Sequence, residues 1–140
     1  MAFTLTVKGA ETLEFGKTMI SSANLAVDTP DDSMARSTDV AITLHVSGKL
    51  LSDEAKNSPT SKLFEWSNTP ATSSDAYREV TVSVITNTDE LKGAPFREIY
   101  LPNAFVVDYS ENYSELRGVG EFSIILRQKA DKVTDVKVNK

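Results

Sequence analysis

A catalytic site in this chain would have to be built from very few residues. The single histidine, His45, lies in an alternating run and faces away from the apolar Ile42, Leu44 and Val46. Nucleophilic catalysis by serine normally needs a histidine that a carboxylate orients. No Gly-x-Ser-x-Gly sequence accompanies His45. We therefore predict that His45 is a strand residue facing solvent or an interface, and that the chain is not an enzyme.

Metal and phosphate sites are equally poorly supported. Asp28, Asp31, Asp32 and Asp39 offer oxygen ligands, but they lack the spacing and closing glutamate of an EF-hand loop. Residues 118–120, Gly-Val-Gly, have too few glycines for a phosphate-binding loop and precede a strand-like run. The chain has no cysteine, which excludes disulfides, thiolate zinc sites and iron–sulfur clusters. We predict no metal and no cofactor.

The elements that would position any site are mainly strands. Apolar residues alternate with polar ones along most of the chain, as on a strand with one buried face. Valine, isoleucine, threonine and aromatic residues supply most of these positions, as pleated surfaces prefer. The predicted strands are centred on residues 5–7, 13–15, 19–27, 40–46, 80–84, 99–101, 105–109 and 122–126, the fourth being closed by Ser47-Gly48. The fold class is therefore mainly β.

One segment departs from this pattern and predicts a short α-helix. Ser58 is a favourable N-cap, and Pro59 suits the first helical position. Leu63, Phe64 and Trp66 form one apolar stripe, which we predict to be the structural core of the helix. A helix this short is not stable alone, so it must dock on the sheet.

Two further segments have consequences for function. A stretch of about twelve residues is longer than the usual two to five of a hairpin loop, so we expect it to have a role. It comprises Asp28, Thr29, Pro30, Asp31, Asp32, Ser33, Met34, Ala35, Arg36, Ser37, Thr38 and Asp39. The charged tail, residues 129–140, predicts either a strand or a mobile segment that orders on a partner.

Composition limits the class of protein further. The chain has 140 residues and a formal net charge of -5. This length fits one domain, residues 1–140. The negative charge argues against a nucleic-acid binder, which needs a basic face. The chain has no apolar run near the ~18 residues of a membrane span, and its first residues lack the pattern of a secretory signal. We expect no specific nucleic-acid recognition, no membrane association and no signal peptide.

Two segments, with the pattern between them, resemble a known family. They are Leu63-Phe64-Glu65-Trp66 and, some forty residues on, the stretch from Asn103 to Tyr113 that reads Asn-Ala-Phe-Val-Val-Asp-Tyr-Ser-Glu-Asn-Tyr. The order is completed by Glu121-Phe122-Ser123-Ile124-Ile125-Leu126. This arrangement is similar to the tube-forming proteins of contractile injection systems: the haemolysin-coregulated protein family of type VI secretion, and the phage tail-tube proteins.

The resemblance implies a β-sandwich or barrel-like tail-tube fold with one short α-helix. It further implies hexameric rings that stack into a hollow inner tube, a conduit or carrier for effectors or DNA. Thr81 and Ser83, on the alternate face of one strand, are then candidates to line the lumen. The long loop at residues 28–39 would be ordered by the neighbouring ring, with Arg36 facing a carboxylate across the join. The partners would be copies of the chain, sheath and baseplate proteins, and cargo. Assembly would occur in the cytoplasm, before export or within a phage-tail-like particle.

Two alternatives remain open from the residues alone. The chain could be a monomeric β-sandwich that binds a carbohydrate or protein ligand, with Trp66 and the four tyrosines as stacking platforms. That interpretation requires exposed, coplanar aromatic rings, whereas the alternation of Phe105, Val107 and Tyr109 predicts burial. The chain could also be a hydrolase, which would require His45, the single histidine, in its catalytic site.

Overall fold

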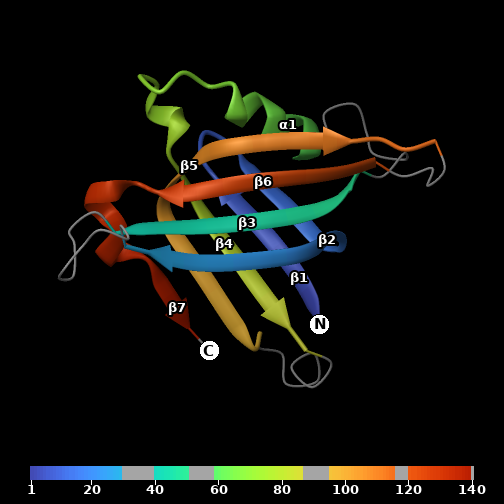
Figure 1. Ribbon diagram of the computed structural model, residues 1–140, viewed down its shortest axis with the longest axis horizontal. Helices are drawn as coiled ribbons and strands as arrows, with labels where there is room; N and C mark the ends of the chain where they lie inside the picture. The colour runs from blue at the N-terminus through green and yellow to red at the C-terminus, as the bar shows by residue number, and fades with distance from the viewer. Residues whose placement is uncertain (30–39, 51–58, 87–94, 116–119, 140) are drawn as a thin grey trace.

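The computed structural model describes residues 1–29, 40–50, 59–86, 95–115 and 120–139, and shows an antiparallel β-barrel with one α-helix at its edge (Figure 1). The elements are β1 (Ala2–Lys8), β2 (Thr12–Asp28), β3 (Ala41–Leu50), α1 (Pro59–Ser67), η1 (Ser74–Ala76), β4 (Arg78–Ile85), β5 (Arg97–Asn112), β6 (Gly120–Gln128), η2 (Ala130–Asp135) and β7 (Lys137–Asn139). The strand order is β4-β1-β2-β3-β6-β5-β7. An additional pairing of β4 with β5 closes the six long strands into a barrel. The mainly-β prediction with one short helix is confirmed.

Two strands, β2 and β5, are long because each takes part in two sheets. Residues 12–20 of β2 pair with β1, whereas residues 20–28 pair with β3. In the same way, residues 97–104 of β5 pair with β4 and residues 104–112 pair with β6. We call the two layers the β1/β4 sheet and the β3/β6 sheet. The first also includes β7, which pairs with residues 98–100 of β5.

The sequence predicted each of these long strands as two separate ones. Gly16 separates the apolar runs in β2, and Pro102 separates those in β5, yet both strands continue through these residues. The register is irregular where each strand changes its partner, between Phe15 and Ile20 of β2 and between Leu101 and Ala104 of β5, and this lets the strands pass from one layer to the other. β3 likewise runs on past Gly48 to Leu50.

The core lies between the two sheets. Its members are the alternate apolar residues of all six barrel strands together with two helix residues, Leu63 and Trp66. The rings of Phe15 and Phe122 join the layers, with centroids 6.1 Å apart. Gly48 is needed beside them, because an added Cβ would lie 2.6 Å from the Phe122 ring and would also clash with the Met19 carbonyl.

The helix α1 places its three predicted core residues differently. Leu63 and Trp66 are buried, but Phe64 is 55% exposed and is not part of the core. The correction has a simple cause: Leu63 and Trp66 are three residues apart and share a face, whereas Phe64 lies about 100° further round the helix. Within the described residues, no helix is long and apolar enough to cross a membrane.

Candidate assembly interface

The β3/β6 sheet has two long edges without a partner strand among the described residues. Residues 22–28 of β2 pair with β3 on one side only, because the pairing of β2 with β1 stops at Ile20, opposite Phe3. Residues 105–112 of β5 pair with β6 on one side only, because β4 begins at Arg78, opposite Ala104. Unpaired strand edges expose a row of N–H and C=O groups that other chains can pair with.

One edge of the β1/β4 sheet is partly paired by another element of the chain. β7 lies along residues 98–100 of β5. The helix α1 contacts both β2 and β5, and its Phe64 ring meets the Tyr109 ring of β5 edge to face, 6.4 Å apart. Lys62 Nζ lies 3.4 Å from carboxylate oxygens of both Glu11, just before β2, and Glu65. A hydrogen bond to Glu65, followed by the charge of Glu11, raises the pKa of Lys62 above its ordinary value. The part of β5 in the β1/β4 sheet thus has a second partner strand, β7, whereas its part in the β3/β6 sheet has none among the described residues.

The outward face of the β3/β6 sheet carries a row of serines in register. Ser22 is paired with Ser47, Ser47 with Ser123, and Ser123 with Ser110, so that one serine comes from each of the four strands. Ser47, Ser123 and Ser110 also line a shallow hollow of about 180 Å³. Small hydroxyl side chains at one level make this part of the face smooth and polar.

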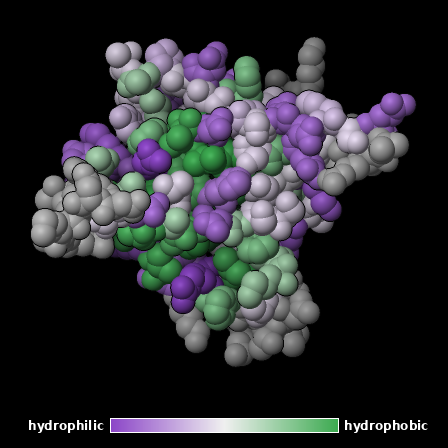
Figure 2. Space-filling view, in the orientation of Figure 1, coloured by the Kyte–Doolittle hydropathy of each residue, from purple (hydrophilic) through white to green (hydrophobic). Residues whose placement is uncertain are grey.

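The neighbouring rows carry larger side chains, most of them polar or charged. On one side of the serines lie Asn24, His45, Ile125 and Asp108, again one from each strand. On the other side are Lys49, Glu121 and Asn112. Figure 2 shows hydrophobic side chains gathered on the left of this view, toward the end where β2 and β6 finish, with hydrophilic ones among them.

His45 is exposed, as its position in the alternating run predicts, and its Nε2 lies 2.5 Å from Ser123 Oγ. The residue opposite it on β2 is Asn24, which brings no carboxylate to the imidazole. The described residues contain no group of three or more side chains that could hold a metal ion.

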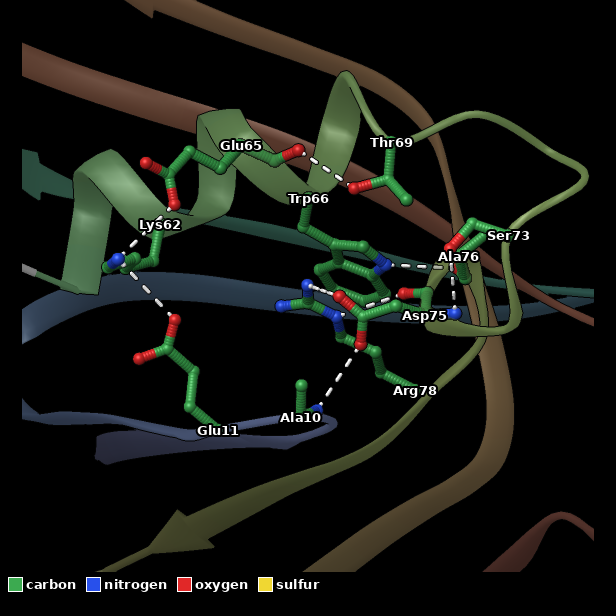
Figure 3. Close-up of polar contacts among 10 residues, drawn as sticks. All are labelled: Ala10, Glu11, Lys62, Glu65, Trp66, Thr69, Ser73, Asp75, Ala76 and Arg78. Carbon is green, nitrogen blue, oxygen red and sulfur yellow. Dashed lines mark hydrogen bonds and ion pairs between the residues drawn. The ribbon is translucent and has the colours of Figure 1, made fainter.

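A buried polar network fixes α1 and η1 to the barrel (Figure 3). Arg78 is only 7% exposed, and its guanidinium lies 2.6 Å from an Asp75 carboxylate oxygen and 5.2 Å from the centroid of the Trp66 ring. The other Asp75 oxygen accepts a hydrogen bond from Ala10 N, at 3.2 Å. The Trp66 indole donates to the Ala76 carbonyl, at 3.0 Å. The network is fully partnered, as a buried ion pair must be if it is not to destabilise the fold.

An open apolar hollow lies beside this network, along the unpaired edge of β5. It has a volume of about 190 Å³, and its lining includes Trp66, Ala71, Tyr77, Phe105 and Val106. The rings of Tyr77 and Phe105 meet edge to face, 5.9 Å apart. One wall of the hollow is thus the edge strand, and the other is the segment that connects α1 to β4.

The sequence-predicted site residues fall into separate places. Thr81 and Ser83 are half-buried and point away from the core on β4, in the β1/β4 sheet. Asp28 ends β2 and is exposed, Thr29 follows it, and residues 30–39 lie outside the described residues. Leu63 and Trp66 pack in the core, as described above.

Sequence reasoning missed the two open edges. Period-two alternation locates a strand and its buried face, but it carries no information on whether the backbone is paired on both sides. The serines at positions 22, 47 and 123 are visible in the sequence as outward residues, but they mark a face of the sheet and not its edges.

The fold is similar to that of chains in solved structures of contractile injection systems and to that of Hcp1. The chain matches a structure of the anti-feeding prophage baseplate with a TM-score of 0.59 and 14% identity, covering 99% of this chain and 92% of that one. It matches Hcp1 from Flavobacterium johnsoniae with a TM-score of 0.58 and 18% identity, over 91% and 90% of the two chains. A third match is a chain in the structure of the sheath/tube terminator of an extracellular contractile injection system, PVC, with a TM-score of 0.57, 15% identity, and coverage of 99% and 94%. The sequence itself matches no family model and no curated protein.

Proposed function

We propose that this chain is a structural subunit that assembles into hexameric rings, and that the rings stack into the hollow inner tube of a contractile injection system. The observation that carries the proposal is the pair of unpaired edges on the β3/β6 sheet. The nearly full-length likeness to Hcp1 and to PVC and anti-feeding prophage components supports it. A tube subunit needs no catalytic group.

The direction of the strands favours a ring. All pairings in the β3/β6 sheet are antiparallel, so its first strand, β2, and its fourth, β5, run in opposite directions. When copies are related by rotation, the β5 edge of one copy meets the β2 edge of the next in an antiparallel pairing. The sheet can therefore continue from copy to copy without a change of pairing type, and a closed ring leaves no edge exposed.

The size of such a ring is reasonable. Six copies of a four-stranded sheet give roughly 24 strands, which at ~4.8 Å each wrap a cylinder about 37 Å across before strand tilt is considered. The number six comes from the family resemblance. In this ring the outward face of the β3/β6 sheet, with its serine row, lines the lumen. In this arrangement Thr81 and Ser83 lie on the β1/β4 sheet and do not line the lumen. Labelling of single cysteines in assembled tubes distinguishes the two assignments.

Stacking of rings is proposed to use the loop of residues 28–39. A head-to-tail contact of this kind is heterologous and produces open filaments. Deleting residues 29–37 should give a folded protein that forms rings but does not stack, as judged by negative-stain microscopy and circular dichroism. Filaments of unchanged length would contradict this role for the loop.

The partners follow from the same proposal. The chains that resemble this one occur in structures of a baseplate and of a sheath-tube complex. We infer that this chain assembles with tube, sheath and baseplate proteins of such a particle, and that effector cargo or DNA passes through its lumen.

The test of the proposal is negative-stain microscopy of the purified full chain, with light scattering over a range of concentrations. Six-fold annuli or tubes are expected. A ~15 kDa monomer at high concentration would contradict the proposal and favour the monomeric binding module. The rings of that module should be exposed and coplanar, but Trp66 is 2% exposed, and the Phe64–Tyr109 and Tyr77–Phe105 pairs are tilted by 62° and 71°. Phe105 and Tyr109 are half-buried, whereas Val107, which was expected to be buried, is 43% exposed beside the irregular register.

A further inference from the structure

The two open edges of the β3/β6 sheet carry complementary features at the same end. The register places Asp28 of β2 opposite Ala41, at the start of β3. Two residues further along β3, Thr43 is opposite Arg127, which is in turn opposite Phe105 of β5. Figure 1 shows the same relation, since β2 and β6 both finish where β3 begins. A rotation about the tube axis keeps this end of every copy at one level.

The β5 side of this end is apolar with a basic rim. Phe105 and Val106 form one wall of the hollow, and Tyr77 forms part of the other. Arg127 is exposed beside Phe105. Lys129 Nζ lies 5.5 Å from the centroid of the Tyr77 ring, and its ion pair with Asp131, at 3.6 Å, is between two exposed side chains. Exposed pairs of this kind contribute little and can be exchanged.

The β2 side of this end has the opposite character. Val27 is 55% exposed although its side chain is on the core side of the strand, opposite the buried Ile42. Asp28, next to it, is exposed on the other side. An exposed aliphatic residue beside an acidic one thus ends the β2 edge, while an apolar hollow with two cations at its rim flanks the β5 edge.

We propose that the hollow beside β5 receives the end of β2 from a second copy of the chain. Val27 of that copy fills the hollow, and its Asp28 lies against Arg127 and Lys129. The inference rests on the proposed ring and names the residues that fix which edges meet and at what level. A hollow of about 190 Å³ accommodates a valine side chain, and burying its branched methyl groups contributes to association.

The test exploits the fact that every copy contributes both edges. The Asp28→Arg variant places a cation against Arg127 and Lys129, and the Arg127→Glu/Lys129→Glu variant places two anions against Asp28. Each alone should raise the concentration needed for ring formation by at least roughly tenfold, because like charges then face each other. Mixed in equal amounts, the two variants should form rings in which they alternate, since every interface is again complementary. Rings are scored by sedimentation velocity and negative-stain microscopy.

Matched controls keep the charge change and move it away from the interface. Glu14→Arg lies in the part of β2 that pairs with β1, and Lys132→Glu/Lys137→Glu lies in η2 and β7. Both should assemble like the wild type. For the hollow, Val27→Ala should weaken assembly roughly fivefold, whereas Val138→Ala, on the comparably exposed valine of β7, should not.

The outcomes separate this inference from the proposed function. If the wild type forms no rings, the proposed function fails and the inference with it. If the wild type and both charge-reversal variants form rings equally well, the ring stands and this inference is wrong. Loss of rings in each variant without recovery on mixing, with circular dichroism and thermal melting unchanged, also overturns it.

Discussion

The two sheets of this barrel share two strands but end in different ways. In the β1/β4 sheet, β7 pairs with residues 98–100 of β5. The β3/β6 sheet ends in residues 22–28 of β2 and 105–112 of β5, which have no second partner strand in the part of the chain that the structure describes, although α1 packs beside β5. Natural proteins blunt or cover long edges to avoid aggregation, so edges without a partner strand are sites where another chain can pair. In the proposed ring, a second copy of the chain pairs with these edges.

The difference extends to the polar groups of each region. Asp75 and Arg78 are tied to each other and to Ala10 and Trp66, and they hold the helix over the end of the barrel. Gly9 makes this packing possible, because an added Cβ would lie 2.9 Å from the Arg78 side chain. The outward serines of the β3/β6 sheet have no comparable burial. The polar groups around Arg78 therefore stabilise the fold of the chain itself, whereas the outward serines of the β3/β6 sheet are accessible from outside the molecule.

The largest expected effect is on the self-contained region. Trp66→Ala removes a buried indole, its hydrogen bond to the Ala76 carbonyl and the ring under Arg78. We expect a loss of about 3–5 kcal/mol in the free energy of unfolding, measured by urea denaturation. Phe64→Ala is the matched control on the same helix, and it should cost far less because Phe64 is 55% exposed. Equal losses for the two variants would mean that the helix does not depend on its buried face.

The second prediction concerns which sheet lines the lumen. The chain has no cysteine, so Ser123→Cys on the β3/β6 sheet and Thr81→Cys on the β1/β4 sheet each introduce a unique thiol. In assembled tubes a polymer-linked maleimide of several kilodaltons should modify the Thr81→Cys variant and leave the Ser123→Cys variant mostly unmodified. The unassembled protein should react more evenly, since Ser123 and Thr81 are both partly exposed.

The opposite pattern would assign the lumen to Thr81 and Ser83. Protection of the thiol at position 81 with free reaction at position 123 would reverse the roles of the two sheets. A small maleimide that reacts with both variants is the control that each thiol is chemically competent. Gel shift after modification measures the extent of reaction.

A third prediction turns the covered edge into an open one. Ending the chain at Val136 removes β7, whose three residues are all exposed and pair only with residues 98–100 of β5. Because no buried group is lost, we expect the thermal midpoint to change by only a few degrees. The uncovered edge should promote irregular association, seen as increased light scattering beside normal rings. A truncated chain as monodisperse as the wild type would show that β7 does not protect this edge.

Most elements could be predicted from the sequence, and the reasons for the misses are physical. Alternation located the buried faces of the barrel strands, and the Ser-Pro start with an apolar stripe located α1. The continuity of β2 and β5 was missed because Gly16 and Pro102 read as interruptions, whereas a strand at a barrel corner tolerates such residues. Phe64 was misplaced because three apolar residues in four cannot all share one face of a helix.

The assembly surface was harder to predict than the fold. An open edge is a property of backbone pairing, which depends on where β1 and β4 end relative to β2 and β5 and not on any one side chain. The hollow beside Phe105 and Tyr77 arises from segments 28 residues apart in the sequence. By contrast, the exposed position of His45 could be predicted from the sequence, because it alternates with the apolar Leu44 and Val46, which are buried.

The smallest expected effect compares one tyrosine from each region. Burial, followed by the nearby charge of Glu79, raises the pKa of Tyr100 in the β1/β4 sheet. For Tyr113, just beyond the open part of β5, the first cause of a raised pKa is its hydrogen bond to the Glu111 carboxylate. A phenol with a raised pKa stays neutral to higher pH, so the hydrogen bond stabilises the fold below about pH 10 and is lost as the pH rises through the pKa of the folded state.

Glu111→Gln removes the charge and should lower the pKa of Tyr113 toward its ordinary value while leaving that of Tyr100 unchanged. Phenolate absorbance during alkaline titration measures both, and the Tyr113→Phe variant identifies which step belongs to Tyr113. If Glu111→Gln moves a step that Tyr113→Phe leaves in place, the assignment of that step to Tyr113 is wrong.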